Sequence, residues 1–243
     1  MGALRLVFLA FGIGACALAL TIGLRAADRN SHSGPANIDR LGKVARVTEF
    51  EGPPMVDKPM LDKVLAAGVP ADNFFGCRVL EAAARTREKD VVRRMLALGA
   101  PLQMDGQYGQ TLPCDALGMA VEGGDPEIVK LVLARHPDPN WGEYPALVRV
   151  LSAPGYVPGD IVPAWPGQAP GNPDPNVGTD KWIARRLEKR IELVRLLLAA
   201  GADPGRNVAG LQNRTPGAML RGLHNTAIDA QLDGWARDHG KKI

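Results

Sequence analysis

The residues of this sequence that could do chemistry are few and lie far apart along the chain. His32, His136, His224 and His239 lack the short, regular spacing of metal ligands. Ser152 has no histidine beside it in sequence to act as its base, and the chain contains no G-x-S-x-G, H-E-x-x-H or phosphate-binding P-loop motif. We therefore expect a protein that is not an enzyme, with no catalytic residue, metal site, cofactor or small-molecule substrate.

The composition narrows the class of protein further. The formal net charge is only +3, whereas a protein that binds nucleic acid electrostatically normally carries a strongly basic face. Hydrophobic residues make up 46 % of the chain, which is enough for a real core. We expect a folded domain whose partners do not include nucleic acid.

The N-terminal residues have the composition of a membrane segment. Leu6 to Leu24 contains no charged residue, and as a helix it would match the ~30 Å hydrocarbon core of a bilayer. The run exceeds the apolar region of about 7–15 residues that is usual in a secretory signal peptide. We expect residues 1–24 to be a transmembrane anchor or uncleaved signal, with membrane contact through residues 6–24. Residues 25–56 are then a polar tether, and the soluble domain of this single-pass membrane protein lies on the exported, periplasmic side.

Cys16 leaves an alternative open. Ile13-Gly14-Ala15-Cys16 resembles a bacterial lipobox, although Ala17 to Leu24 stay apolar where a lipoprotein normally turns polar. In this alternative the chain is a periplasmic lipoprotein-like immunity or chaperone protein that binds one specific partner.

From residue 57 onward one pattern recurs. An apolar stretch ends in Leu-Ala and is followed by Gly-Ala and Pro, with copies at 61–70, 91–101, 127–139 and 192–204. A shorter alanine-rich stretch precedes the copies, most clearly at 79–86 and 116–124. The paired stretches predict helix-turn-helix units. One such unit cannot bury both of its helices, so the units must stack.

These residues resemble the ankyrin repeat family, whose unit is about 33 residues long. EIVKLVLARHPDPN and ELVRLLLAAGADP are the strongest matches, and Thr215-Pro216 resembles the start of a unit. The resemblance implies an all-α fold, an ankyrin-repeat solenoid of about four helix-turn-helix units over residues 57–243. The apolar run at 6–24 adds one transmembrane helix before it.

The chain departs from this pattern in three places. The outer-helix starts Val91 and Ile128 are farther apart than one unit, and we expect the extra residues to lengthen the first helix of that unit. His136-Pro137 replaces the usual Gly-Ala. A Pro/Gly-rich insertion at 153–179 separates YPALVRVLS (144–152) from a helix predicted over Lys181 to Ala200, whose basic first part forms either a solvated face or a site for an acidic partner.

The resemblance implies another protein as the partner. Ankyrin domains bind proteins through the loops between units, which suggests a membrane-tethered, non-catalytic protein–protein interaction module of ankyrin type. Exposed aromatic residues on such loops are typical binding hot spots. The candidate contacts are Asp105, Gln107 and Tyr108 in the first loop, Trp141, Glu143 and Tyr144 in the second, and Tyr156 and Trp165 in the insertion, where they either recognise a partner or pin the loop to the body.

Cys77 and Cys114 lie near the starts of the first helices of adjacent units. A disulfide needs Cα atoms about 4.4–6.8 Å apart, whereas equivalent points on stacked helices lie about 8–10 Å apart. The two cysteines are not at equivalent positions, so a disulfide and two buried free thiols both remain open.

Overall fold

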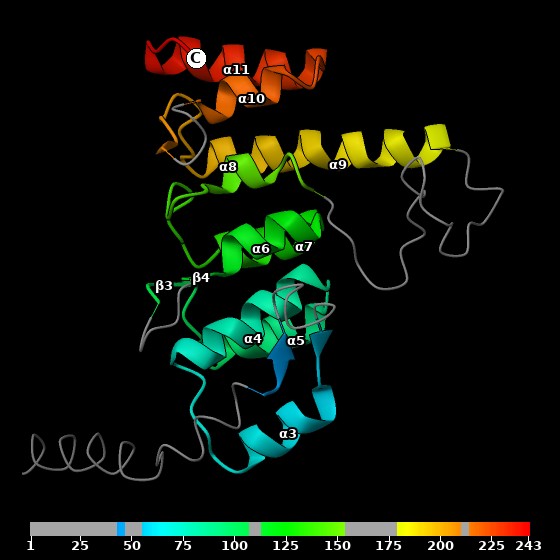
Figure 1. The fold of residues 1–243 in the computed structure, drawn as a ribbon, viewed down its shortest axis with the longest axis vertical. Coiled ribbons are helices and arrows are strands. Elements are labelled where there is room, and N and C mark those ends of the chain that lie inside the picture. Colours follow the sequence, from blue (N-terminus) through cyan, green and yellow to red (C-terminus); the bar gives the residue numbers. More distant parts are fainter. Residues whose placement is uncertain (1–42, 47–54, 107–112, 154–178, 210–213) are drawn as a thin grey trace, which may run out of the picture.

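The computed structural model of this chain describes residues 43–46, 55–106, 113–153, 179–209 and 214–243 (Figure 1). Most of these residues lie in helices, as an all-α class requires. In chain order the elements are β1 (Ala45–Arg46), β2 (Met55–Val56), α3 (Lys58–Ala66), α4 (Phe74–Arg85), α5 (Lys89–Ala97), β3 (Gln103–Met104), β4 (Cys114–Asp115), α6 (Ala116–Gly123), α7 (Pro126–Leu133), α8 (Ala146–Arg149), α9 (Thr179–Ala199), α10 (Pro216–Arg221) and α11 (Thr226–His239).

Four helix pairs follow one another along the described chain and lie one above another (Figure 1). In the first row α4 packs on α6, α6 on α8 and α8 on α10. In the second row α5 packs on α7, α7 on α9 and α9 on α11. The buried apolar side chains of all four pairs form one continuous cluster. Each pair therefore buries its apolar surface mainly against its neighbours, as in a repeat protein.

α3 and a short antiparallel ladder cover the N-terminal end of the stacked helix pairs. In this ladder Ala45 lies opposite Val56 and Arg46 opposite Met55, and both strands contact α4. Val44, 1 % exposed, adds to the core, and its carbonyl accepts a hydrogen bond of 2.8 Å from the N–H of Asp57.

Short polar side chains begin most of these helices. Each accepts a hydrogen bond from a free N–H in the first turn, which satisfies a donor that the helix itself cannot pair. Proline follows in the first turn of α3, α7 and α10, where its missing N–H costs nothing. The capping residues are Asp57 (α3), Asn73 (α4), Asp115 (α6), Asp125 (α7), Thr215 (α10) and Asn225 (α11).

Left-handed residues follow α3 and the second-row helices α5, α7 and α9. Gly68, Gly99 and Gly201 come after α3, α5 and α9 with φ of +78°, +80° and +92°. After α7, where the sequence departs from Gly-Ala, His136 itself takes φ of +54°. His136-Pro137 thus replaces Gly-Ala in sequence, but the backbone after α7 keeps the positive φ found after the other helices.

Arginines donate hydrogen bonds to backbone carbonyls near the ends of neighbouring helices. Arg87 Nε donates to the Gly123 carbonyl (2.7 Å) and Arg135 Nη2 to the Leu96 carbonyl (2.8 Å). Arg190 on α9 donates to two carbonyls just after α8. Burial lowers the pKa of this guanidinium, with the nearby Arg186 adding to the effect. The contacts of Arg87 and Arg135 join one unit to the next, and those of Arg190 join the two helices of one pair.

The predictions of a transmembrane helix and of a membrane localisation are wrong. No helix in the described part of the chain is both long and apolar enough to cross a bilayer. The longest, α9, carries charged residues along its length as far as Arg195. This finding contradicts a fold that includes a membrane-spanning helix and the placement of the chain as a single-pass membrane protein. Residues 6–24, on which the prediction was based, and Cys16 lie outside the described residues.

The expected lengthening of α6 is also wrong. This helix has only 8 residues, because Asp115 caps it by accepting a hydrogen bond from the N–H of Gly118 (3.0 Å). The extra residues therefore precede the helix. The helix predicted over 181–200 is α9, found at Thr179–Ala199.

The positive φ of Gly201 makes a stability prediction. An added Cβ at this position meets no atom within 4 Å, so Gly201→Ala adds only backbone strain and lowers the free energy of unfolding by about 1–2 kcal/mol. Gly234→Ala is the matched control. It lies inside α11, where an added Cβ would meet only Arg237 Nη2 at 3.8 Å, an ordinary van der Waals contact. The substitution raises the free energy of unfolding by about 0.5–1 kcal/mol. Urea unfolding followed by circular dichroism measures both changes, and effects of equal sign would contradict this account.

Candidate interaction surface

The loops that join successive helix pairs are linked by amide side chains. Gln103 Nε2 donates to the carbonyl of Asp138 (2.7 Å), and the N–H of Asp138 donates back to Gln103 Oε1 (3.0 Å). Asn140 makes the same kind of reciprocal contact with the third loop. Its Nδ2 donates to the Gly201 carbonyl (2.9 Å) and its Oδ1 accepts from the N–H of Asp203 (2.7 Å). The second loop is thus held by the loops on both sides.

Hydrogen bonds within the second loop, residues 137–145, fix it further. The N–H groups of Asn140 and Trp141 donate to the side chain and the carbonyl of Asp138, at 2.8 and 3.2 Å. The N–H of Ala146 donates to the Pro139 carbonyl at 3.1 Å. This loop is therefore an ordered element fixed from within and from both sides.

The structure places four of the predicted contact residues on these loops. Asp105 and Glu143 are exposed, Trp141 is half-buried and Tyr144 is 40 % exposed. Asp105 lies two residues beyond Gln103, whose side chain holds the second loop. The first two loops are thereby joined at their bases. The other predicted contacts, Gln107, Tyr108, Tyr156 and Trp165, lie outside the described residues.

Cys77 and Cys114 are joined by a disulfide, with their Cα atoms 6.2 Å apart. Cys77 lies in the first turn of α4, whereas Cys114 lies in β4 just before α6, so the two cysteines do not occupy equivalent positions on the stacked helices. Both are fully buried and pack with Phe74. The bridge anchors the second strand of the β3–β4 ladder, which forms the base of the first loop and pairs Met104 with Cys114.

A buried carboxylate, which the sequence analysis missed, lies beside this bridge. Glu81 on α4 is 1 % exposed; its Oε1 accepts a hydrogen bond from the N–H of Asp115, and its Oε2 lies 2.8 Å from Arg78 Nη1. Burial raises the pKa of Glu81 to about 7, opposed by Arg78 and by the N–H of Asp115. A single glutamate within the apolar stretch VLEAAA is the sequence signal that could have drawn attention to it.

Arg149 on α8 extends this polar contact to the next unit. Its guanidinium pairs with Glu122 and lies 3.5 Å from Asp115 Oδ2. Gly118 makes room for it, since a Cβ there would come within 2.4 Å of Arg149 Nε. Burial raises the pKa of Asp115, while the N–H of Gly118 and Arg149 oppose that rise. The first-row helices of three units are thus connected through polar side chains.

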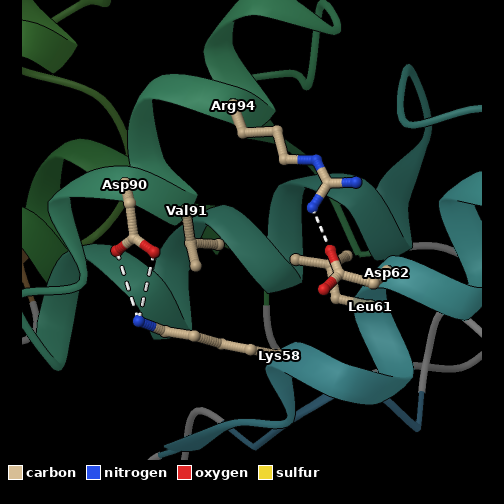
Figure 2. A pocket seen from close by; sticks show the side chains of 6 residues that line it. All are labelled: Lys58, Leu61, Asp62, Asp90, Val91 and Arg94. Atoms are coloured by element: carbon tan, nitrogen blue, oxygen red, sulfur yellow. Dashed lines mark hydrogen bonds and ion pairs between the residues drawn. The ribbon is translucent and has the colours of Figure 1, made fainter.

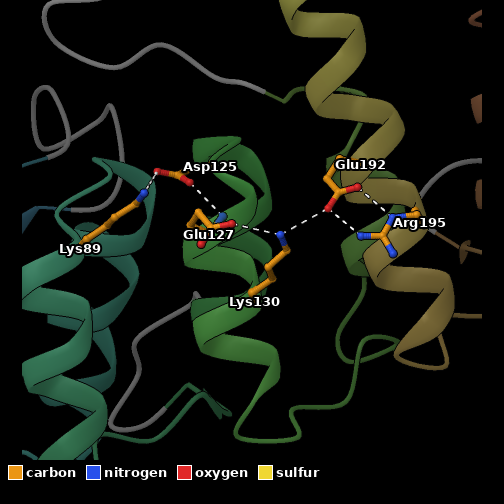
Figure 3. Close-up of polar contacts among 6 residues, drawn as sticks. All are labelled: Lys89, Asp125, Glu127, Lys130, Glu192 and Arg195. Atoms are coloured by element: carbon orange, nitrogen blue, oxygen red, sulfur yellow. Dashed lines mark hydrogen bonds and ion pairs between the residues drawn. The ribbon is translucent and has the colours of Figure 1, made fainter.

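Ion pairs connect the second-row helices (Figure 3). Lys89 pairs with Asp125 between α5 and α7 (3.2 Å). Lys130 pairs with Glu192 between α7 and α9 (3.5 Å). Hydrogen bonds to Arg195 and Lys130 lower the pKa of Glu192 against the opposing effect of desolvation. Exposed pairs of this kind contribute about 0–1 kcal/mol each. They help to orient the helices more than they stabilise them.

A cavity of about 250 Å³ lies between α3 and α5 (Figure 2). Leu61 and Val91 contribute to its lining. Lys58 pairs with Asp90 (3.2 Å) and Arg94 with Asp62, and both pairs join α3 to α5. The charged groups that a ligand would need are already engaged with each other. The volume is also below the ~300–1,000 Å³ usual for ligand pockets.

The remaining chemistry is sparse in the part of the chain that the structure describes. There, no group of three or more His, Cys, Asp or Glu side chains could hold a metal ion. Compared with models of protein families, with curated proteins and with solved structures, the chain gives no match.

Glu81 predicts a pH dependence of stability. Between pH 4.5 and about 7 the folded protein binds a proton at Glu81 that the unfolded chain does not, so the free energy of unfolding falls as the pH rises through this range. The total change from this group is about 3 kcal/mol at most. Urea unfolding at pH 5 and pH 8 measures it. Glu81→Gln should flatten the dependence, while the exposed control Glu127→Gln should preserve it. Equal slopes for Glu81→Gln and the wild type would refute the assignment.

The disulfide predicts a loss of stability when it is removed. Closing a loop between residues 37 apart stabilises a chain by roughly 3–4 kcal/mol, so the double variant Cys77→Ala/Cys114→Ala should unfold at correspondingly lower urea concentration. Thiol titration of the denatured, unreduced wild type should find one of the three cysteines reactive, since 3 − 2 = 1. Three reactive thiols would show that the bridge does not form.

Proposed function

We propose that this chain is an ankyrin-type binding module that recognises another protein through the loops joining its helix pairs. The observation that carries the proposal is the second loop, which hydrogen bonds hold from both sides while Tyr144 stays 40 % exposed. A loop held in this way presents its aromatic side chain to solvent on a fixed backbone, which is the arrangement that an interface residue needs.

The energetics of binding favour such a surface. Ordering a mobile side chain at an interface costs about 0.5–1.5 kcal/mol, and a loop that is already fixed avoids much of the ordering cost. Tyrosine and tryptophan dominate binding hot spots, because they bury a large rigid surface and also carry a polar atom. Trp141 and Tyr144 are three positions apart on this loop.

The arrangement of the helices also supports an ankyrin-type module. Paired helices contact mainly the neighbouring pairs, and left-handed residues separate the second-row helices from the loops that follow them. Two features set this chain apart from the regular unit. The helix α9, with 21 residues, is much longer than α5 or α7, and α8 has only four residues.

The test is capture of partners by chemical cross-linking in the cells that produce the protein. The double variant Trp141→Ala/Tyr144→Ala should weaken partner binding by about 2 kcal/mol or more, roughly thirtyfold, as hot-spot residues do. Met55→Ala is the matched control, because it removes a similarly exposed apolar side chain at the N-terminal end of the row. Circular dichroism confirms that each variant folds. Unchanged capture by the folded double variant would refute the proposal.

A deletion of residues 154–178 in the same experiment tests the insertion separately, because it keeps the buried Ala153 and the whole of α9. Circular dichroism again confirms that the variant folds. Loss of capture after the deletion alone would assign recognition to Tyr156 and Trp165 instead of the second loop.

A further inference from the structure

The disulfide between Cys77 and Cys114 lies outside the main core. Both cysteines pack with Phe74 in a small buried cluster of their own, and Phe75 and Met104 lie partly buried against it. The continuous cluster that joins the four helix pairs contains neither cysteine. A satellite cluster of this kind can open locally while the main core stays packed, because stability is not uniform across a protein. The bridge can therefore be broken without unfolding the helix pairs.

The position of the bridge allows such a local opening. Both cysteines are fully buried, so a reductant reaches the sulfurs only after neighbouring residues move. Cys77 lies in the first turn of α4 and Cys114 in the two-residue strand β4. The end of a helix and a very short strand open at lower free-energy cost than the middle of a packed helix. A small dithiol can thus reach the bridge in the folded protein.

A short series of contacts runs from Cys114 to the second loop. In the β3–β4 ladder Met104 lies opposite Cys114, and Gln103, the other residue of β3, lies opposite Asp115. The side chain of Gln103 exchanges two hydrogen bonds with the backbone of Asp138 in the second loop, at 2.7 and 3.0 Å. The bridge therefore anchors the pair of strands from which Gln103 holds the second loop.

The other side of the second loop is held independently of the bridge. Asn140 binds the third loop through the Gly201 carbonyl (2.9 Å) and the N–H of Asp203 (2.7 Å). The third loop follows α9, in a helix pair that the bridge does not join. Loss of the bridge should therefore loosen one side of the second loop and leave the other side in place.

We propose that the Cys77–Cys114 bridge is a redox-sensitive clamp, and that its reduction by a dithiol loosens the second loop on the side of Gln103. A thiolate of the dithiol attacks one sulfur, which breaks the S–S bond, forms a mixed disulfide and releases the other cysteine. The second thiolate of the dithiol then attacks the mixed disulfide and releases the remaining cysteine. Two electrons and two protons pass to the cysteines, which become thiols, and the dithiol is oxidised to a disulfide.

Native-state hydrogen exchange of the full chain before and after treatment with dithiothreitol tests this inference. The N–H of Asp138 should exchange about two- to tenfold faster after reduction, the range expected for the loss of one hydrogen bond. The N–H of Asp203 should keep its rate, since its acceptor is Asn140. Circular dichroism should show an unchanged helical signal in the reduced protein.

Two variants identify the path from the bridge to the loop. Cys77→Ala/Cys114→Ala is the matched control, because it keeps Cys16 but has no bridge. In this variant Asp138 should exchange fast whether or not dithiothreitol is present. In Gln103→Ala the contact through which the bridge acts is absent, so Asp138 should exchange equally fast in the oxidised and the reduced form.

Three results would overturn the inference. The first is reduction that occurs only together with loss of the helical signal. The second is equal exchange at Asp138 in the oxidised and the reduced wild type. The third is a rise at Asp203 as large as the rise at Asp138, which would show that reduction loosens the whole row of loops.

The effect of the clamp on partner binding rests on the proposed function. If that function holds, Cys77→Ala/Cys114→Ala should capture a partner about two- to tenfold less, because the loosened loop must be ordered again on binding. If Asp138 responds to reduction as expected but Trp141→Ala/Tyr144→Ala leaves capture unchanged, the proposed function is wrong and the clamp is confirmed. If that aromatic double variant abolishes capture but reduction leaves exchange at Asp138 unchanged, the loops bind proteins and the clamp is wrong.

Discussion

The packing of α6 against α4 is the contact on which the rest of this molecule depends. Gly123 allows the two helices to approach, since a Cβ there would come within 2.6 Å of the Ala84 carbonyl oxygen. The disulfide and the hydrogen bond from Asp115 to Glu81 lie at the other end of α6. Each helix pair buries its apolar surface against its neighbours, so the position of one pair determines where the next pair packs. Arg149 on α8, which pairs with Glu122 on α6, is one such contact. The packing of α6 on α4 therefore also determines how far apart the loops between the pairs lie.

Much of the fold could be predicted from the sequence, because its helix pairs are local. Stretches such as ELVRLLLAAGADP carry the apolar period, the left-handed end and the proline together, and Gly201 follows α9 as that pattern indicates. The position of the extra residues before α6 could not be predicted, since spacing alone does not distinguish a longer helix from a longer loop. The side chain of Asp115, as a cap, makes that distinction. The membrane-spanning helix was predicted from hydropathy alone and is contradicted by the described helices.

The loop residues of the candidate surface could be predicted from the sequence, but the contacts that hold the loops could not. The repeat pattern put Asp105, Trp141, Glu143 and Tyr144 on loops, and the described loops contain them. Their rigidity depends on Gln103 and Asn140, whose partners lie 35 and more residues away in sequence. Glu81 was missed likewise because its partner, the N–H of Asp115, belongs to the next unit. Contacts between units become visible only once the stacking register is known.

We conclude that the second loop is ordered by its neighbours before any partner binds. Native-state hydrogen exchange at the N–H groups of Asp138, Trp141 and Asp203 tests it directly, since each donates a hydrogen bond that holds the loops together. We expect these N–H groups to be protected nearly as well as those of the adjoining helices, and the N–H of Asp203 to exchange faster in Asn140→Ala. Exchange at the rate of an unstructured peptide in the wild type would contradict it.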